Sequence, residues 1–368
     1  MDFSYNDDQK AIRELARKML EEMATHERLK EVKATPERVD RTLWRELAKA
    51  NLLGVAIAEQ HGGNGGWLTE LALLMEEVGR AVAPVPVYPT LVLGALPLAE
   101  FGSDALKAKW LPRIASGDAI LAHAIVDDRP IDVVTARRDG DAYVLNGTRS
   151  LVQAAHVADA IFVPARTDAG PALFVVDAKV KGVHLERVET TDEHLRPHFH
   201  ANDVRVSAAD VVGAIGHGDA IAAWTQQRAT LALCAMQVGV AERALQITAR
   251  YATERQQFDR PIGSFQAVHT RAGDAFVDVQ AMKLTMLRAL HLLEQREDAT
   301  ENLIIAKYWA ADGGGRVAYA AQHLHGGIGV DVDYPIHRYY LWARQIGLHL
   351  GSGAEQVELL GERFARAR

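Results

Sequence analysis

The sequence predicts an α+β fold in which a helical N-terminal domain, a middle antiparallel β domain and a C-terminal helical bundle follow one another. Residues 1–117 and 214–368 carry apolar side chains at spacings of three and four, the period of amphipathic helices. Residues 118–213 instead carry short apolar runs separated by turn signals, which is typical of strands. A chain of 368 residues is also too long for one ordinary hydrophobic core, so two or three domains are expected.

Composition and charge narrow the class of protein. With 48% hydrophobic and 24% charged residues, the chain is expected to be globular and soluble. Its net charge of −7 argues against a nucleic-acid partner, because phosphate backbones select basic surfaces. Charged residues interrupt the apolar runs of residues 1–20, and no run is long enough to span a bilayer. We therefore expect no signal peptide and no membrane partner, and the cytoplasm is the expected location.

The N-terminal part is predicted to consist of helices joined by short loops. Its apolar side chains recur at helical spacing, and a glycine cluster at residues 62–66 indicates a loop. The expected helices cover residues 7–23, 41–51, 68–82, 90–101 and 104–114.

The middle part is predicted to form a sheet. Asp139-Gly140 and Asn146-Gly147 are dipeptides that favour tight hairpin turns, so a hairpin is expected at each. Phe199, which lies between two histidines, is expected on the surface of a strand. The expected strands cover residues 121–126, 133–136, 143–145, 160–163, 173–176, 183–188 and 203–206.

The C-terminal part is predicted to contain two long helices joined by a hinge. Residues 231–255 lack proline and are rich in Ala, Leu, Val and Met, which indicates a helix that buries the single Cys234. Pro261 and Gly263 end the helical pattern, and the Ser264 hydroxyl is expected to cap the next helix. That helix carries an apolar stripe formed by Val268, Ala272, Phe276, Val279, Met282, Met286, Leu290 and Leu293.

The hinge carries side chains suited to a ligand. Arg255 supplies a cation, Gln257 and Gln266 supply amides, and Phe258 supplies an aromatic ring. A planar guanidinium matches phosphate geometry and stacks on flat rings. The hinge is therefore predicted to bind a planar ligand that bears phosphate.

The spacing Arg-x-x-Phe-x-x-x-Ile-x-x-Phe-Gln at residues 255–266 resembles the acyl-CoA dehydrogenase family, in which it lies between two helices of the C-terminal bundle. The resemblance continues over essentially the whole chain and in the same order. The further matching segments are residues 59–66, Gly326-Gly327-Ile328-Gly329, Tyr334-Pro335-Ile336 and Arg338-Tyr339-Tyr340. The helix–sheet–helix order predicted above is also the order of domains in this family.

The resemblance implies α,β-dehydrogenation of an acyl-CoA thioester, in which a glutamate removes the α-proton and the β-hydride passes to FAD. A carboxylate in an apolar site has a raised pKa that suits it to this task. Leu350 occupies the usual position of this base, and Ala229 occupies the position used by other members. Neither side chain can accept a proton, so no catalytic residue is predicted in this chain.

Segments that the resemblance places against the flavin ring are also altered. Val126–Ile131 replaces the family's Thr-Glu-Pro segment, and Leu151-Val152-Gln153 replaces a Trp-Ile-Thr tripeptide whose threonine serves flavin N5. The segments that hold a neighbouring subunit's FAD at its pyrophosphate and AMP end are retained. By this resemblance the cofactor-binding residues are Arg255, Gln257, Phe258, Ile262, Phe265, Gln266, Gly326 and Gly327, with His323 in the place of a glutamine.

Three hypotheses about function follow. In the first, the chain is a non-catalytic subunit that shares FAD with a homologous catalytic subunit, as in the α2β2 enzymes of actinobacteria that act on CoA thioesters of steroid side chains. An electron-transfer flavoprotein is then the expected acceptor. In the second, the chain works alone with an unrecognised base such as His349. In the third, it is a binding or scaffold protein without redox chemistry. A metal site is not expected, because His323, His325 and His349 have no cysteine or carboxylate at ligand spacing.

Overall fold

A computed structural model describes residues 3–124 and 133–366. The chain forms two compact units, each built from separated segments. Unit 1 comprises Met1–Lys30, Leu68–Ala83 and Thr230–Arg368, and unit 2 comprises Glu31–Trp67 and Pro84–Ala229. The three-domain division at residues 117 and 213 stays a prediction.

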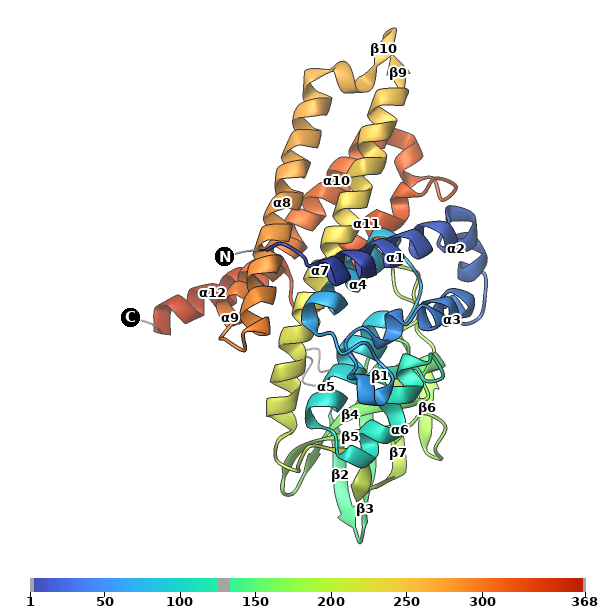
Figure 1. Ribbon diagram of the computed structural model, residues 1–368, viewed down its shortest axis with the longest axis vertical. Helices are drawn as coiled ribbons and strands as arrows, with labels where there is room; N and C mark the ends of the chain where they lie inside the picture. The colour runs from blue at the N-terminus through green and yellow to red at the C-terminus, as the bar shows by residue number, and fades with distance from the viewer. Residues whose placement is uncertain (1–2, 125–132, 367–368) are drawn as a thin grey trace. The chain divides into compact units, whose positions relative to one another are not determined.

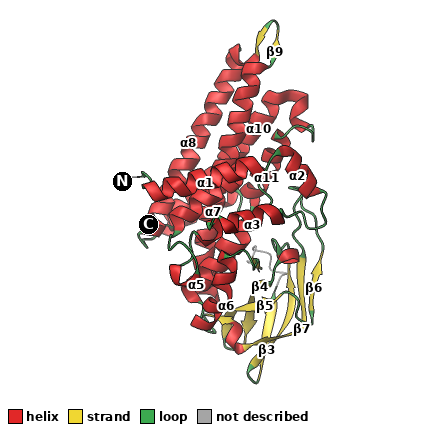
Figure 2. Cartoon of the chain, turned by 45° about the vertical axis from the view of Figure 1, so that its right-hand side comes forward, coloured by secondary structure: helices red, strands yellow, loops and turns green. Residues whose placement is uncertain are grey.

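Unit 2 is built around an eight-stranded sheet (Figure 2). The strand order is β6-β7-β3-β2-β4-β5-β8, and β1 pairs with β4. The strands are β1 (Leu121–His123), β2 (Val134–Asp139), β3 (Ala142–Arg149), β4 (Ala160–Thr167), β5 (Gly170–Asp177), β6 (Val183–Glu186), β7 (His198–Ser207) and β8 (Val211–Val212). The helices of unit 2 are α3 (Arg41–Lys49), α5 (Leu96–Phe101) and α6 (Asp104–Ala115), with a π-helical segment at Tyr88–Ala95 before α5.

The antiparallel sheet expected from the sequence is in fact mixed. The β2–β3, β3–β7, β4–β5, β5–β8 and β6–β7 pairs are antiparallel, but β1 runs parallel to β4 and β2 meets β4 in parallel at one position. A parallel pair needs a long connection, and the β2–β3 hairpin lies within the one that joins β1 to β4. Short apolar runs predict that strands exist, but they carry no information about the direction in which strands pair.

Two further strand predictions were wrong. Asn146-Gly147 forms no hairpin, because both residues lie within β3, where the register with β7 shifts in a β-bulge. The extra residue of the bulge lies on β7, where Asp203 has φ +52°. Gly147 is needed for another reason, because a Cβ atom there would lie 2.2 Å from the Val133 carbonyl oxygen. Phe199 is fully buried rather than on the surface, since alternation along β7 turns it inward. The hairpin at Asp139-Gly140 is confirmed by the β2–β3 pairing.

Unit 1 is helical, and α7 and α8 run side by side to a two-stranded tip (Figure 1). Residues from α7, α8 and α10 share one buried cluster that includes Val238, Val279 and Val317. The helices of unit 1 are α1 (Asp7–Met23), α4 (Leu68–Arg80), α8 (Gln266–Glu294), α9 (Thr300–Tyr308), α10 (Gly314–His325), α11 (Ile336–Leu348) and α12 (Gly353–Arg366). Two helices, α2 (His26–Lys33) and α7 (Gly218–Glu254), pass from one unit into the other.

The predicted start of α8 needs correction. A 3-10 turn at Ile262–Ser264 precedes it, and the Ser264 hydroxyl donates to the Pro261 carbonyl (2.7 Å) instead of capping the helix. The helix begins at Gln266 without a side-chain cap. Its predicted apolar stripe is buried from Val279 onward, whereas Phe276 is 56% exposed. Cys234 is buried as predicted, and burial raises the pKa of its thiol to about 12.

Helices α4 and α7 touch through their backbones at two glycines. A Cβ atom added to Gly239 would lie 1.8 Å from the Glu76 carbonyl oxygen, and one added to Gly79 would lie 2.1 Å from the Met236 carbonyl oxygen. Real Cβ atoms do not come so close to backbone atoms, so this crossing requires glycine on both helices.

A buried ion network joins α1 to α4. Arg13 donates to Glu76 (2.5 Å) and to Glu77 (3.2 Å), and Arg17 donates to both oxygens of Glu77. Both carboxylates are 1% exposed, so they depend on these arginines for their hydrogen bonds. Within residues 3–124 and 133–366, no helix is both long enough and apolar enough to cross a membrane.

Candidate functional site

The α7–α8 hairpin ends in a tight turn that displays its tip residues. Strand β9 (Gln256–Gln257) pairs with β10 (Arg260–Pro261), which leaves Phe258 and Asp259 as a two-residue loop. Both have positive φ, +55° and +60°, as a hairpin turn of this length requires. Phe258 is 88% exposed and meets the Phe265 ring edge to face at 6.2 Å.

Arg255 lies at the base of this turn, one residue after α7. Its backbone N–H donates to the Tyr251 carbonyl, and its own carbonyl accepts from the Ile262 N–H, both at 2.8 Å. Its side chain is exposed, and among the described residues its guanidinium has no hydrogen bond or ion pair. Gln257 and Gln266 are also exposed, whereas Ile262 and Phe265 are half-buried. The hairpin therefore fixes the backbone of Arg255 and leaves its charge available.

The glycine segment follows α10 as a 3-10 turn over Gly326–Val330. Gly326 has φ +62° and ψ −138°, a conformation that only glycine adopts readily. Gly329 is needed for packing, because a Cβ there would lie 2.7 Å from the Gln322 carbonyl oxygen. Gly327 has neither constraint, since a Cβ on it would meet no described atom within 4 Å. The open space beside Gly326 and Gly327 suits a ligand that approaches the backbone closely.

An aromatic stack joins the hairpin to the glycine segment. The rings of Tyr251, on the last turn of α7, and His325, at the end of α10, stack at 4.4 Å with a 24° angle between planes. His325 Nδ1 lies 2.7 Å from the Ala321 carbonyl, so it donates there, and its Nε2 lies 3.3 Å from the Tyr334 hydroxyl. Burial lowers the pKa of His325, which favours this neutral form. The hairpin at residues 255–266 and the glycine segment at residues 326–329 are therefore joined through α7 and α10. The spacing of these residues in the sequence does not reveal that contact.

His323 lies on the last turn of α10. Its Nδ1 is 2.5 Å from Nη1 of Arg271 on α8, and its ring stacks beside Tyr319 at 6.1 Å. His323 is exposed and Arg271 is half-buried. Arg271 was not among the predicted site residues, because its nearness to His323 depends on how α8 and α10 pack.

Leu350 follows α11 in a left-handed conformation, with φ +57° and 8% exposure. Its carbonyl accepts a hydrogen bond from Gln356 at 3.4 Å. The preceding helix end is held by Lys307, whose ammonium donates to the carbonyls of Ile346 and Gly347 at 3.1 Å each. Ala229, the other predicted position of a base, is fully buried on α7. Neither position presents a group that could remove a proton.

Lys307 has a titration that can be tested. It is fully buried, and burial lowers its pKa from 10.5 to about 8. Between these values the unfolded chain binds more protons than the folded chain, so this group makes stability rise with pH from about 8 to 10.5, by about 1.4 kcal/mol per unit. Urea unfolding at several pH values should show this rise in the parent chain and not in Lys307→Met. The matched change Lys18→Met, on the exposed face of α1, should leave the slope unchanged; equal slopes in all three proteins would contradict the assignment.

In the segment Leu151-Val152-Gln153, which replaces the flavin-contacting tripeptide, two backbone N–H groups are already hydrogen-bonded within the chain. Leu151 has φ +54°, and its N–H donates to His198 Nδ1 at 3.2 Å. The N–H of Val152 donates to the Pro197 carbonyl at 2.8 Å, and its side chain is 2% exposed. These donors are occupied, and Leu151 and Val152 have no polar side-chain group, so neither of these two residues can contact the polar edge of a flavin ring. The other altered segment, Val126–Ile131, lies outside the described residues.

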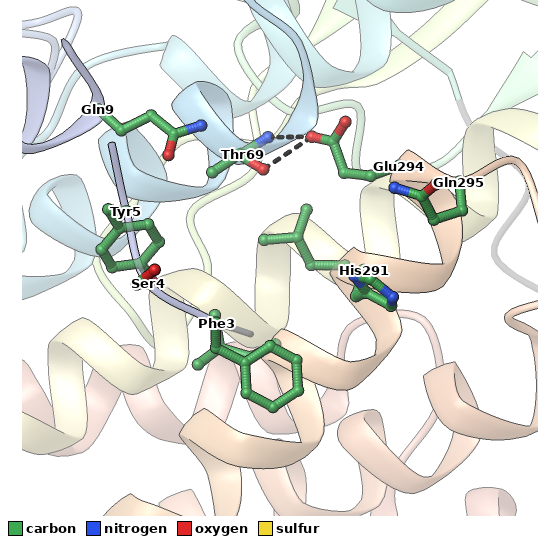
Figure 3. A pocket seen from close by; sticks show the side chains of 10 residues that line it. Phe3, Ser4, Tyr5, Gln9, Thr69, His291, Glu294 and Gln295 are labelled. Carbon is green, nitrogen blue, oxygen red and sulfur yellow. Dashed lines mark hydrogen bonds between the residues drawn. The ribbon is translucent and has the colours of Figure 1, made fainter. Parts of the chain in front are cut away.

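A separate cavity of about 240 Å³ lies where the N-terminal segment meets α4 and the end of α8 (Figure 3). Its one carboxylate among the described lining residues, Glu294, accepts hydrogen bonds from the Thr69 N–H (2.7 Å) and hydroxyl (2.8 Å), and so caps α4. No predicted site residue lines it. In the ranges that the structure describes, no three His, Cys, Asp or Glu side chains gather as a metal site.

Comparison with known proteins gives matches over nearly the whole chain. Residues 6–118 match the acyl-CoA dehydrogenase N-terminal domain, and residues 216–365 match the acyl-CoA dehydrogenase C-terminal domain. The acyl-CoA dehydrogenase FadE27 of Mycobacterium tuberculosis is 39% identical over 373 residues, which cover 99% of each chain. A chain in the ChsE4-ChsE5 complex from Mycobacterium tuberculosis is 39% identical, with a TM-score of 0.94 over 99% of both chains. A chain in a variant of the Tcur3481-Tcur3483 steroid ACAD is 40% identical, with a TM-score of 0.91 over 98% of both.

Proposed function

Because this chain belongs to the acyl-CoA dehydrogenase family, we propose that it serves in an FAD-dependent acyl-CoA dehydrogenase without abstracting the substrate proton itself. It contributes the pyrophosphate- and AMP-binding half of an FAD site to a homologous catalytic chain. That partner supplies the glutamate and the segments that hold the flavin ring. When bound, the FAD takes up the hydride that leaves the β-carbon of the acyl group.

One contrast supports this division. Among the residues assigned to a neighbour's cofactor, the polar side chains Arg255, Gln257 and Gln266 are exposed, and Gly326 and Gly327 lie beside free space. The residues assigned to the chain's own flavin and base are closed, with Val152 and Leu350 buried and the N–H groups of Leu151 and Val152 already bonded. Loss of function by random substitution would not sort the two groups in this way.

Each open residue has a role toward the cofactor. The Arg255 guanidinium offers charge-assisted hydrogen bonds to phosphate oxygens, and the amides of Gln257 and Gln266 can donate to further acceptors. The exposed Phe258 ring offers a flat apolar surface. Gly326 and Gly327 allow close approach to their backbone, because no side chain stands in the way.

The proposed substrates are CoA thioesters of steroid side chains, and the proposed assembly contains two copies of each chain. The similarity to a chain of the Tcur3481-Tcur3483 steroid ACAD supports the substrate class, and the similarity to a chain of the ChsE4-ChsE5 complex supports a partner of the same family. An electron-transfer flavoprotein is the proposed electron acceptor.

Flavin counting tests this proposal. The chain should be purified alone and after co-expression with a homologous chain that carries the glutamate, and FAD should be measured by absorbance. We expect no flavin on the chain alone and one flavin for every two chains in the complex, with acyl-CoA oxidation only in the complex. Bound FAD and turnover in the chain alone would support a self-sufficient enzyme instead, and a colourless complex would support a scaffold.

Leu350→Glu should not create dehydrogenase activity in the chain alone. The carboxylate would return to the position of the base, but Leu151 and Val152, whose N–H groups are already bonded, still could not hold the flavin ring. Because Leu350 is 8% exposed, the new group must stay protonated or unpaired, which should destabilise the fold by on the order of 2 kcal/mol. Dye-coupled acyl-CoA oxidation and thermal unfolding measure both effects. Leu348→Glu, at a site that is 58% exposed, is the matched control and should unfold like the parent; turnover by Leu350→Glu alone would refute the silent-subunit assignment.

A further inference from the structure

The contact between Arg271 and His323 fixes the position of a proton. An arginine guanidinium carries only donors and stays charged at any physiological pH. With Nη1 of Arg271 2.5 Å from Nδ1 of His323, the imidazole must accept at Nδ1. The proton of the neutral ring then lies on Nε2. His323 is thereby held as a hydrogen-bond donor at the nitrogen that points away from Arg271.

We infer that Arg271 is a positioning residue that holds His323 in its Nε2–H form, so that this N–H donates to an acceptor atom of the shared FAD. The inference rests on the proposed function. His323 is exposed and lies three residues before Gly326, where the backbone is open to a ligand. Tyr319 stacks beside the ring with a 19° angle between planes, so the ring has a second contact that limits its rotation.

A free neutral imidazole can carry its proton on either nitrogen. With the proton on Nδ1, the Nε2 lone pair would face the oxygen atoms of the cofactor, and lone pair would meet lone pair. The guanidinium excludes that form. Cofactor binding then requires no rearrangement of the ring or its proton, which is the benefit of a preorganised donor.

The packing of α8 against α10 does not depend on Arg271 alone. Helices α8 and α10 are already joined by Arg316, which donates to both oxygens of Asp278 at 2.9 and 2.6 Å. They also share the buried cluster that contains Val279 and Val317. Arg316 therefore provides a matched control, because it bridges the same two helices through Asp278 and makes no hydrogen bond to a histidine among residues 3–124 and 133–366.

The test measures FAD affinity in the assembled complex by the change in flavin fluorescence on binding, independently of turnover. Arg271→Met should weaken FAD binding on the order of tenfold, the loss of one well-oriented hydrogen bond. Arg271→Lys should restore part of the affinity, because an ammonium can also donate to Nδ1. Arg316→Met should leave FAD affinity unchanged.

The deciding comparison uses His323→Ala. Without the imidazole there is no proton for Arg271 to position, so Arg271→Met should have no further effect in that background. A tenfold loss that persists there would show that Arg271 acts without His323, and the inference would be wrong. Unchanged affinity in the single Arg271→Met variant would overturn it as well. If Arg255→Ala also leaves affinity unchanged, the proposed function fails; if only the Arg271 variants do so, the proposed function stands.

Discussion

Arg255→Ala should reduce FAD retention by the assembled complex by about ten- to a hundredfold while leaving the chain folded. The Arg255 side chain is exposed and, within the described residues, makes no hydrogen bond or ion pair, so its removal should not disturb the hairpin. Charge-assisted hydrogen bonds to phosphate contribute about 1.5–3 kcal/mol, which corresponds to this range. Flavin content after gel filtration and circular dichroism of the isolated chain measure the two expectations.

Two further variants sharpen this test. Arg255→Lys should restore only part of the retention, because an ammonium cannot present the planar fork of a guanidinium. Arg250→Ala is the matched control, since Arg250 lies near the end of α7, five residues before Arg255, and is exposed but already pairs with Glu254 at 2.8 Å. Equal flavin content in the Arg255→Ala and parent complexes would show that Arg255 does not hold a neighbour's cofactor.

Gly239→Ala should prevent unit 1 from folding normally. The new methyl group would lie 1.8 Å from the Glu76 carbonyl oxygen and 2.7 Å from the Arg80 backbone nitrogen. Both atoms belong to the backbone of α4, so a change of rotamer cannot relieve the clash and the helices must separate. We expect a loss of about 3 kcal/mol or more in the free energy of unfolding, measured by urea denaturation.

The control for this prediction is Gly273→Ala on α8. A Cβ there meets no described atom within 4 Å, so the better helix propensity of alanine should raise stability by about 1 kcal/mol. Opposite signs at two helical glycines are the expected result. Similar small effects at both would mean that the backbones of α4 and α7 are not in contact at Gly239.

The sequence predicts the elements of this fold better than their arrangement. Side-chain periodicity placed α1 at residues 7–23, as observed, because one face of that helix alone determines the pattern. Pairing direction in the sheet was not predictable, since it depends on how connections cross the sheet. Asn146-Gly147 was misassigned because glycine is favoured in a strand as well as in a turn where another backbone segment comes close, as the Val133 carbonyl does at Gly147.

For the candidate site too, the sequence predicts which residues belong to it better than how they contact one another. The spacing of residues 255–266 and 326–329 indicated which residues belong to it. Tyr251 and Arg271 were missed, because their roles arise from contacts between helices: Tyr251 reaches His325 across α7 and α10, and Arg271 reaches His323 across α8 and α10. Such pairs can be identified only once it is known which faces of the helices pack together. The assignment of individual residues to FAD contacts, which rests on the resemblance to the family, stays a prediction.

The backbone contact of Gly79 with α7 also has a consequence for biosynthesis. Helix α4 emerges early from the ribosome, but the part of α7 that it contacts follows only after residues 84–229. At about 5–20 residues per second, this delay is on the order of ten seconds. During that interval unit 2 can complete its sheet, whereas the face of α4 that packs against α7 stays uncovered. Chaperone binding should therefore be strongest for nascent chains that end between residues 84 and 229.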